Sequence, residues 1–187
     1  MKTALLLIDI QREYFEGGSM PLPGALAAAA RASTMRAYFR HSRRPAVFVQ
    51  HIAANPEAVS FRAGTPGVCL YSTMRPLPGE AVVRKHHPNS FRDTNLLDLL
   101  RSYHVTRLAI CGMMTHMCVD TTVRAAADFG FGCIVAADAC AAQDLTFGEM
   151  FVPAPTVPAA FMAALDRSFA SVRTTDEILA ELEDEQA

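Results

Sequence analysis

The sequence predicts an α/β fold of three layers (αβα), in which helices cover both faces of a mainly parallel six-stranded sheet. The apolar runs are continuous and not alternating, which is typical of strands buried on both faces. Helical patterns lie between several of these runs, and this alternation favours a parallel sheet. With 187 residues, 51% of them hydrophobic and 19% charged, the chain is expected to form a single domain over residues 1–187.

The expected elements follow one another in a regular order. Strands are predicted at residues 4–10, 46–50, 81–84, 108–111, 133–137 and, from a weaker run, 170–173. Helices are predicted at residues 26–41, 96–103, 119–129 and 159–167. A last helix is expected at "TTDE", where Thr174 and Glu177 have the spacing of a capping box. The stretch 52–80, rich in proline, glycine and small polar residues, is too long for an ordinary connection, which is typical of a functional or mobile loop.

Charge, hydropathy and cysteine content limit which binding partners and which cellular compartment we expect for the protein. The net charge of -2 gives no basic footprint, so we expect no nucleic-acid partner. The first apolar run stops at Asp9 with no cleavage site after it, and no run approaches the roughly 20 residues of a membrane span. We therefore expect a buried first strand, no membrane contact and a cytoplasmic protein. Five cysteines with no CxxC pair favour a reduced chain without disulfides.

Polar residues follow the predicted strands, at the edge where parallel sheets bind ligands. They are Asp9 and Gln11 after the first strand, His51 after the second, Lys85 after the third, the turn 112–118 after the fourth and Asp138 after the fifth. A carboxylate, an amine and a thiol are therefore expected to meet at one edge of the sheet.

Cys118 directly precedes a helical pattern of apolar residues. A thiol at a helix N-terminus has its thiolate stabilised by the dipole and by backbone N–H groups, which can also receive an oxyanion. The alternative is a buried, inert cysteine. That alternative is our interpretation of the other four cysteines, which are Cys69, Cys111, Cys133 and Cys140.

Asp9 closes an apolar run, where an unpaired buried carboxylate would cost several kcal/mol. Lys85 closes another such run and is the natural partner. These two residues alone are equally consistent with a structural ion pair. With the thiol of Cys118 beside them, the carboxylate can take the thiol proton while the ammonium positions the carboxylate.

Three segments resemble signatures of the isochorismatase-like cysteine hydrolases, a family with a Rossmann-like fold. They are "LLLIDIQREYFEGGSMPLPG", "VVRKHHPNSFRDTNLLDLL" and "LAICGMMTHMCVDTTVRAAADFGFGCIVAADAC", which together span essentially the whole chain in the family's order. The resemblance implies a catalytic triad of Asp9, Lys85 and Cys118. It further implies a cis peptide between Met113 and Met114, and an oxyanion hole formed by the N–H groups of Met114 and Cys118.

Four further residues are candidates for contact with a substrate. Gln11, Phe15 and Phe61 are expected to line the pocket, with core packing as the alternative for the two aromatic residues. His116 lies two residues before Cys118, and we interpret it as a substrate-lining or surface residue and not as half of a Cys–His dyad.

No metal and no cofactor are expected. Nicotinamidases in this superfamily hold a metal with an Asp-x-His pair and further histidines. Here Val49 stands at the aspartate position and only His51 remains of the pair, with no cluster of hard ligands after it. His86 and His87 are adjacent, so an extended backbone directs them to opposite sides.

The resemblance implies a cysteine hydrolase that cleaves a C–N bond of a small amide-like substrate through a thioester on Cys118. One alternative is an isochorismatase-type vinyl ether hydrolase that uses Asp9 without a covalent step. Another is a non-catalytic oligomeric member of the family. The apolar segment 147–162 predicts a homo-oligomer, a dimer or a tetramer, unless that segment packs on its own sheet as an ordinary crossover.

Overall fold

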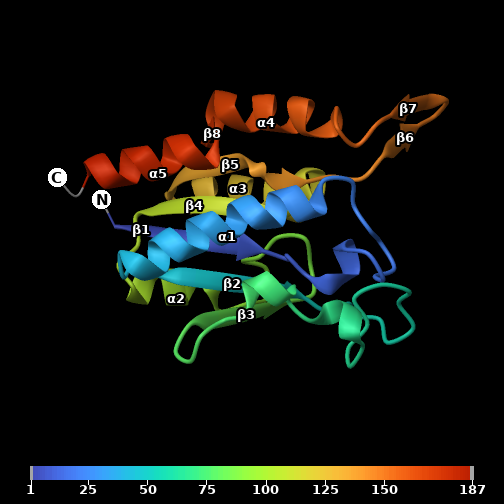
Figure 1. Ribbon diagram of the computed structural model, residues 1–187, viewed down its shortest axis with the longest axis horizontal. Helices are drawn as coiled ribbons and strands as arrows, with labels where there is room; N and C mark the ends of the chain where they lie inside the picture. The colour runs from blue at the N-terminus through green and yellow to red at the C-terminus, as the bar shows by residue number, and fades with distance from the viewer. Residues whose placement is uncertain (1, 186–187) are drawn as a thin grey trace.

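A six-stranded parallel sheet forms the centre of the protein in the computed structural model, which describes residues 2–185 (Figure 1). Its strands are β1 (Thr3–Ile8), β2 (Ala46–His51), β3 (Ala81–Lys85), β4 (Arg107–Met113), β5 (Gly132–Ala141) and β8 (Ser171–Arg173). They lie in the order β3-β2-β1-β4-β5-β8, and every neighbouring pair is parallel. The predicted fold class is confirmed, and all six strands lie within a few residues of their predicted positions.

Five helices cover the two faces of this sheet. They are α1 (Ala25–His41), α2 (Leu96–Ser102), α3 (Asp120–Asp128), α4 (Val157–Ser168) and α5 (Thr175–Asp184). Buried residues of α1 and α5 belong to the core on one face, and those of α2, α3 and α4 to the core on the other. The predicted capping box is present at the start of α5, where Thr174 accepts the N–H of Glu177.

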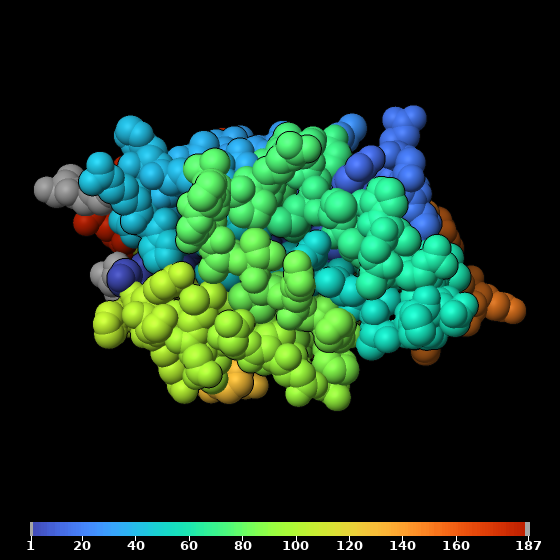
Figure 2. Space-filling view, turned by 90° about the horizontal axis from the view of Figure 1, so that it is seen from below, coloured from blue at the N-terminus to red at the C-terminus, as the bar shows by residue number. Residues whose placement is uncertain are grey.

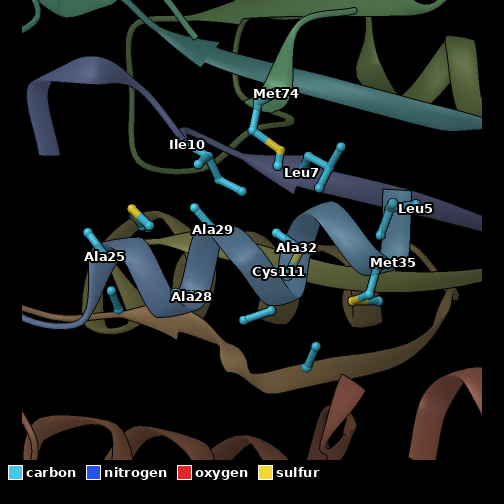
Figure 3. Close-up of a cluster of buried hydrophobic side chains, with 14 of the residues drawn as sticks. Leu5, Leu7, Ile10, Ala25, Ala28, Ala29, Ala32, Met35, Met74 and Cys111 are labelled. Atoms are coloured by element: carbon cyan, nitrogen blue, oxygen red, sulfur yellow. The ribbon is translucent and has the colours of Figure 1, made fainter. Parts of the chain in front are cut away.

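Small side chains let α1 lie close against the centre of the sheet. Its alanines at 25, 28, 29 and 32 all face the sheet and are buried, and Leu5 and Leu7 of β1 point toward them (Figure 3). This spacing of three and four residues places one face of a helix on the core. Because β1 is covered on both faces, the residue that follows it is also inside the protein.

Two features differ from the sequence prediction. The run 81–84 was expected to be buried on both faces, but β3 is an edge strand whose Val82 and Arg84 are exposed. The prediction that this strand is buried on both faces is therefore wrong, because the face with Val82 and Arg84 is open to solvent. The segment after β5 also forms an unpredicted antiparallel hairpin, β6 (Leu145–Phe147) and β7 (Met150–Val152), which projects from the body of the protein (Figure 1).

The long loop 52–80 contains two short 3-10 turns, Pro66–Val68 and Ser72–Met74. Gln11 holds this loop against the sheet, because its side-chain amide donates to the carbonyl of Val68 at 2.8 Å and its backbone forms an isolated bridge with Leu70. The loop therefore has a fixed attachment beside the carboxyl end of β1. No helix within residues 2–185 is long and apolar enough to cross a membrane.

Candidate active site

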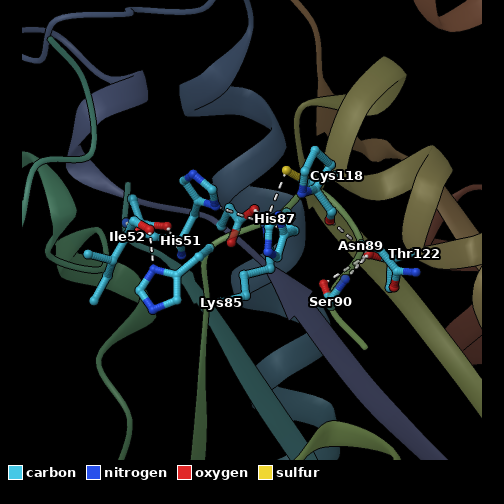
Figure 4. Close-up of polar contacts among 12 residues, drawn as sticks. His51, Ile52, Lys85, His87, Asn89, Ser90, Cys118 and Thr122 are labelled. Atoms are coloured by element: carbon cyan, nitrogen blue, oxygen red, sulfur yellow. Dashed lines mark hydrogen bonds and ion pairs between the residues drawn. The ribbon is translucent and has the colours of Figure 1, made fainter. Parts of the chain in front are cut away.

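Three strands bring a carboxylate, an ammonium group and a thiol together. Asp9 follows β1, Lys85 ends β3, and Cys118 lies in the turn after β4. The Lys85 Nζ atom is 2.6 Å from Asp9 Oδ2 and 3.2 Å from Cys118 Sγ (Figure 4). Asp9 and Lys85 are almost completely buried, and Cys118 is 7% exposed. The sequence-predicted triad is thus one contiguous cluster in which only Cys118 keeps a small exposed fraction.

The backbone at Asp9 turns the carboxylate away from the strand. Asp9 still donates its N–H to Val49 of β2, but its φ is 51°, in the left-handed region that non-glycine residues seldom occupy. Such conformations cluster at functional sites, where the surrounding structure holds them. The turn directs the side chain toward Lys85. Lys85 ends β3, which is separated from β1 by β2, so its side chain extends across the end of β2 to Asp9.

Burial makes Asp9 a stronger base than an ordinary carboxylate. Loss of solvent raises the pKa of Asp9, while the Lys85 charge, a hydrogen bond from the Cys118 thiol and the backbone of His51 lower it in part. Burial alone would lower the pKa of Lys85, but the charges of Asp9 and Cys118 raise it above its ordinary value. Lys85 therefore stays an ammonium ion at neutral pH.

The thiol of Cys118 rests in its protonated form. Burial, followed by the Asp9 charge, raises the pKa of Cys118 to about 12, although Lys85 acts in the opposite direction. The sequence predicted a thiolate stabilised at a helix N-terminus. Instead, Cys118 lies inside a π-helical turn, Thr115–Val119, that precedes α3, and desolvation dominates. A nucleophile in this position needs a base, and Asp9 is the carboxylate within hydrogen-bonding reach.

The turn that carries Cys118 begins with unusual backbone geometry. The peptide between Met113 and Met114 is cis, as the resemblance implied. Gly112, directly before it, has a φ of 138°, and a Cβ atom built there would lie 2.0 Å from the carbonyl oxygen of Ile8. Only glycine fits this close approach of β4 to β1. Met114 and Cys118, the predicted oxyanion donors, both belong to the segment that this approach positions.

His51 is a neighbour of the triad that the sequence left without a role. It pairs with Lys85 in the register of β2 and β3, and its Nδ1 atom is 3.4 Å from Lys85 Nζ. The ammonium group can only donate, so Nδ1 accepts and the proton of the neutral ring is on Nε2. Burial, and then the Lys85 charge, lowers the pKa of His51 to about 4, which keeps the ring neutral.

The other two histidines of this region are used separately. His86 approaches the carbonyl oxygen of Ile52 through Nδ1 at 2.7 Å. The backbone oxygen of His87 accepts a hydrogen bond from Lys85 at 3.1 Å, whereas its ring faces Asp93. Among the described residues, no three His, Cys, Asp or Glu side chains converge in a way that could hold a metal ion.

The four predicted substrate contacts have different surroundings. Gln11 is fully buried, and its amide bonds the backbone of His51 in both directions and the carbonyl of Val68. All polar atoms of its side chain are thus hydrogen-bonded to backbone, and its contact with substrate stays a prediction. His116 packs its ring against Phe161 of α4, with 5.9 Å between the ring centroids.

The two predicted aromatic residues belong to packed pairs. Phe15 stacks on Tyr71 with ring centroids 3.6 Å apart. Phe61 meets the edges of Tyr14 and His51, at 5.1 and 5.2 Å between centroids. Phe61 therefore reaches the triad through His51, whereas Phe15 belongs to the neighbouring wall formed by the loop.

Sequence reasoning missed Tyr14 and Glu13. The buried Tyr14 ring lies 5.1 Å from the ring of Phe61, which in turn contacts His51 beside the triad. Burial, together with the charges of Cys118, Asp9 and Glu13, raises the pKa of Tyr14 well above its ordinary value. Glu13 is buried and accepts the N–H of Phe61 at 3.2 Å. The available signal was a charged residue inside the run "QREYF", where a buried carboxylate requires a partner.

The chain is similar in sequence to known proteins. Residues 3–177 match the isochorismatase domain family. The chain is 45% identical over 179 residues to the isochorismatase family protein YddQ of Bacillus subtilis, covering 96% of this chain and 99% of that protein. It is 36% identical over 157 residues to a streptothricin hydrolase of Streptomyces noursei, covering 84% of this chain and 55% of the hydrolase.

Solved structures give the same picture. An isochorismatase-hydrolase crystal structure from Oleispira antarctica superposes with a TM-score of 0.93 at 46% identity and covers 96% of both chains. An N-carbamoylsarcosine amidase from Thermoplasma acidophilum superposes with a TM-score of 0.81 at 26% identity, covering 94% of this chain and 98% of the amidase.

Proposed function

The chain belongs to the isochorismatase family, whose members are hydrolases that include amidohydrolases, and from this premise we propose that it hydrolyses a C–N bond of a small amide-like substrate through a thioester on Cys118. The observation that carries the proposal is the position of Lys85 Nζ between Asp9 Oδ2 and Cys118 Sγ, at 2.6 and 3.2 Å. An ether hydrolysis by Asp9 alone would make no use of a thiol held there.

Each residue of the cluster has one task in the proposed reaction. Asp9 takes the proton of the Cys118 thiol, and the sulfur attacks the carbonyl carbon of the substrate. The backbone N–H groups of Met114 and Cys118 hold the resulting oxyanion. Asp9 then gives its proton to the nitrogen of the leaving amine, the C–N bond breaks, and a thioester remains on Cys118.

Water completes the cycle. Asp9 accepts a proton from a water molecule that attacks the thioester, and this proton returns to the sulfur as the carboxylic acid leaves. Lys85 keeps the carboxylate oriented throughout and partly neutralises each anionic state. The raised pKa of Asp9 supports this assignment, because a base with a higher pKa takes a thiol proton at a lower free-energy cost.

The test is a screen for ammonia or amine release over a panel of small carboxamides, ureido compounds and N-carbamoyl amino acids, followed by mass spectrometry of the quenched enzyme. We expect an acyl adduct on the peptide that contains Cys118. Turnover of an amide without any such adduct under single-turnover conditions would sink the thioester mechanism. Hydrolysis of a vinyl ether by the Cys118→Ala variant would support the non-covalent alternative instead.

A further inference from the structure

A groove lies beside the reaction centre at the β3 edge of the sheet. It has a volume of about 730 Å³, within the range of small-molecule sites, which is roughly 300–1,000 Å³. Its walls are the segment 12–18, the loop segment 66–76 and the outer face of β3. None of Asp9, Lys85 and Cys118 lines it. Figure 2 faces this edge, with β3 and the loop 52–80 in green and teal and part of the blue N-terminal segment beside them.

The groove is lined by three arginine side chains and by only one carboxylate. They are Arg12, Arg75 and Arg84, all exposed, and the carboxylate is that of Glu16. Within residues 2–185, none of the three guanidinium groups has an ion pair or a side-chain hydrogen bond.

The concentration of positive charge in the groove is local. The whole chain has a net charge of -2, so three cations in one concavity are not the result of a basic composition. Arg40, which donates to the carbonyl of Arg75 nearby, is already paired with Glu80 at 2.6 Å and adds no free charge. An anion bound here would supply the guanidinium groups with the charge partner that they lack among residues 2–185.

The same walls of the groove also carry aromatic and aliphatic side chains. Tyr71 stacks on Phe15 with an interplanar angle of 9°, and Val82 of β3 is 41% exposed. The loop wall is held in place, because Gln11 and Gln50 both donate to the carbonyl of Val68 at 2.8 Å. A preformed surface of this kind lowers the entropy cost of binding.

We propose that this groove is a second binding site, separate from the reaction centre, for a small organic anion that carries a phosphate or carboxylate group on a planar apolar body. Planar guanidinium forks match the oxygens of both groups bidentately. The aromatic wall takes the planar body by stacking and by burial of its apolar surface.

Isothermal titration of the protein with phenyl phosphate and with benzoate tests the proposal. We expect saturable binding of at least one of these ligands with one site per chain, and the tighter ligand identifies the preferred head group. Inorganic phosphate and phenol, which each lack half of the ligand, should bind at least about tenfold more weakly. The affinity should also fall with added salt, since exposed charges are screened.

Three variants locate the site. Arg75→Gln/Arg84→Gln should weaken binding about tenfold or more, because charge-assisted hydrogen bonds are lost, while Arg101→Gln on α2 should leave the affinity within twofold. Cys118→Ala should bind as tightly as the native chain. The proposal is overturned if neither aromatic anion binds saturably, if the double variant binds normally, or if Cys118→Ala abolishes binding. Circular dichroism of each variant shows that a loss is not caused by unfolding.

Discussion

Lys85 is surrounded by more acceptors than it has hydrogens. Its ammonium group faces Asp9 at 2.6 Å, the carbonyl of His87 at 3.1 Å, the sulfur of Cys118 at 3.2 Å and His51 at 3.4 Å. Because an ammonium ion has three N–H donors, these contacts compete. When the thiol loses its proton the sulfur becomes the stronger acceptor, so Lys85 can shift its hydrogen bonds without moving.

The roles of Asp9, Cys118 and His116 can be ranked by substitution. We expect Cys118→Ala and Asp9→Asn each to lower turnover by at least about 10³-fold, because the first removes the nucleophile and the second removes the base. His116→Ala is the matched control and should cost less than about tenfold, since its ring packs on Phe161. Initial rates of amine release measure all three, and the reverse ranking would indicate a Cys–His dyad.

The pH dependence of kcat/KM should follow Asp9. Its pKa is raised and only the ionised form can accept the thiol proton, so activity is lost as the pH falls through a value above 3.8. The rate should then stay level up to about pH 9, because the pKa of Lys85 is raised above 10.5. The ring of His116 packs on Phe161, so His116→Ala should leave the acid limb where it is. A limb that moves in this variant would assign the proton transfer to the histidine.

At the scale of elements, Asp138 connects three parts of the chain. The sequence placed it after the fifth strand, but β5 continues to Ala141 through a register shift opposite β4, so Asp138 lies within the strand. One carboxylate oxygen accepts both the N–H and the hydroxyl of Thr175 at 2.8 Å, and the other accepts Arg31 of α1 at 2.7 Å. Asp138 thereby fastens the start of α5 to α1 and to the sheet.

We expect Asp138→Ala to lower the free energy of unfolding by about 1–3 kcal/mol at pH 7, since it leaves the Thr175 N–H without its acceptor. Burial by itself would raise the pKa of Asp138, but Thr175 and Arg31 lower it below 3.8. A lowered pKa means that the stabilisation is complete above the ordinary value and is lost as the pH falls through the native one.

The difference between the native chain and Asp138→Ala in urea unfolding should therefore shrink below about pH 4. Asp176→Asn is the matched control. Asp176 also pairs with Arg31, but it is 77% exposed, so its loss should change the free energy of unfolding by less than about 0.5 kcal/mol. An equal loss in both variants would mean that Arg31, and not Thr175, carries the effect.

The helices and strands that the sequence predicted are those whose pattern of apolar residues follows from burial in the core. Continuous apolar runs located β1 and β4, and a helical pattern located α1, because both patterns follow directly from packing on a core. The π-helical turn at Cys118 and the hairpin at 145–152 left no such pattern. The first depends on the close approach of Gly112 to β1, and the second is hardly buried at all.

Some residues of the candidate site could be predicted from the sequence, and others could not. Asp9, Lys85 and Cys118 could be predicted, because each is a polar residue at the end of a buried strand and together they match a family signature. The structural role of Gln11 and the proximity of Tyr14 could not, because both depend on how the loop 52–80 folds back over β1 and β2. The protonation state of Cys118 also depends on burial, which the position of a residue before a helix does not reveal.

At the scale of the whole molecule, the hairpin leaves apolar side chains uncovered. Phe147, Met150 and Phe151 are 86%, 66% and 60% exposed. Helix α4, which begins at Val157 within segment 147–162, instead packs on the sheet through Met162 and Leu165. The two alternatives for this segment thus apply to different parts of it. Exposed apolar groups of this kind typically mark an interface.

We expect the chain to form a homo-oligomer, a dimer or a tetramer, through this hairpin. Light scattering at micromolar concentration should give a multiple of 20.3 kDa, and Phe147→Ser/Phe151→Ser should reduce it. Val59→Ser is the control, since Val59 is 92% exposed but lies outside the hairpin. A monodisperse native mass of 20.3 kDa would contradict the expectation.

The central place of β1 has a consequence for synthesis on the ribosome. Strand β1 pairs with β2 on one side and with β4 on the other. Thr3 can pair with Arg107 only after another 104 residues have been synthesised. At roughly 5–20 residues per second, this interval is on the order of 5–20 seconds. Throughout it, the apolar strand 4–8 has an unpaired edge, the kind of template on which nascent chains aggregate. Slower translation lengthens that interval, so the yield of soluble protein should depend on chaperones that bind the first hundred residues.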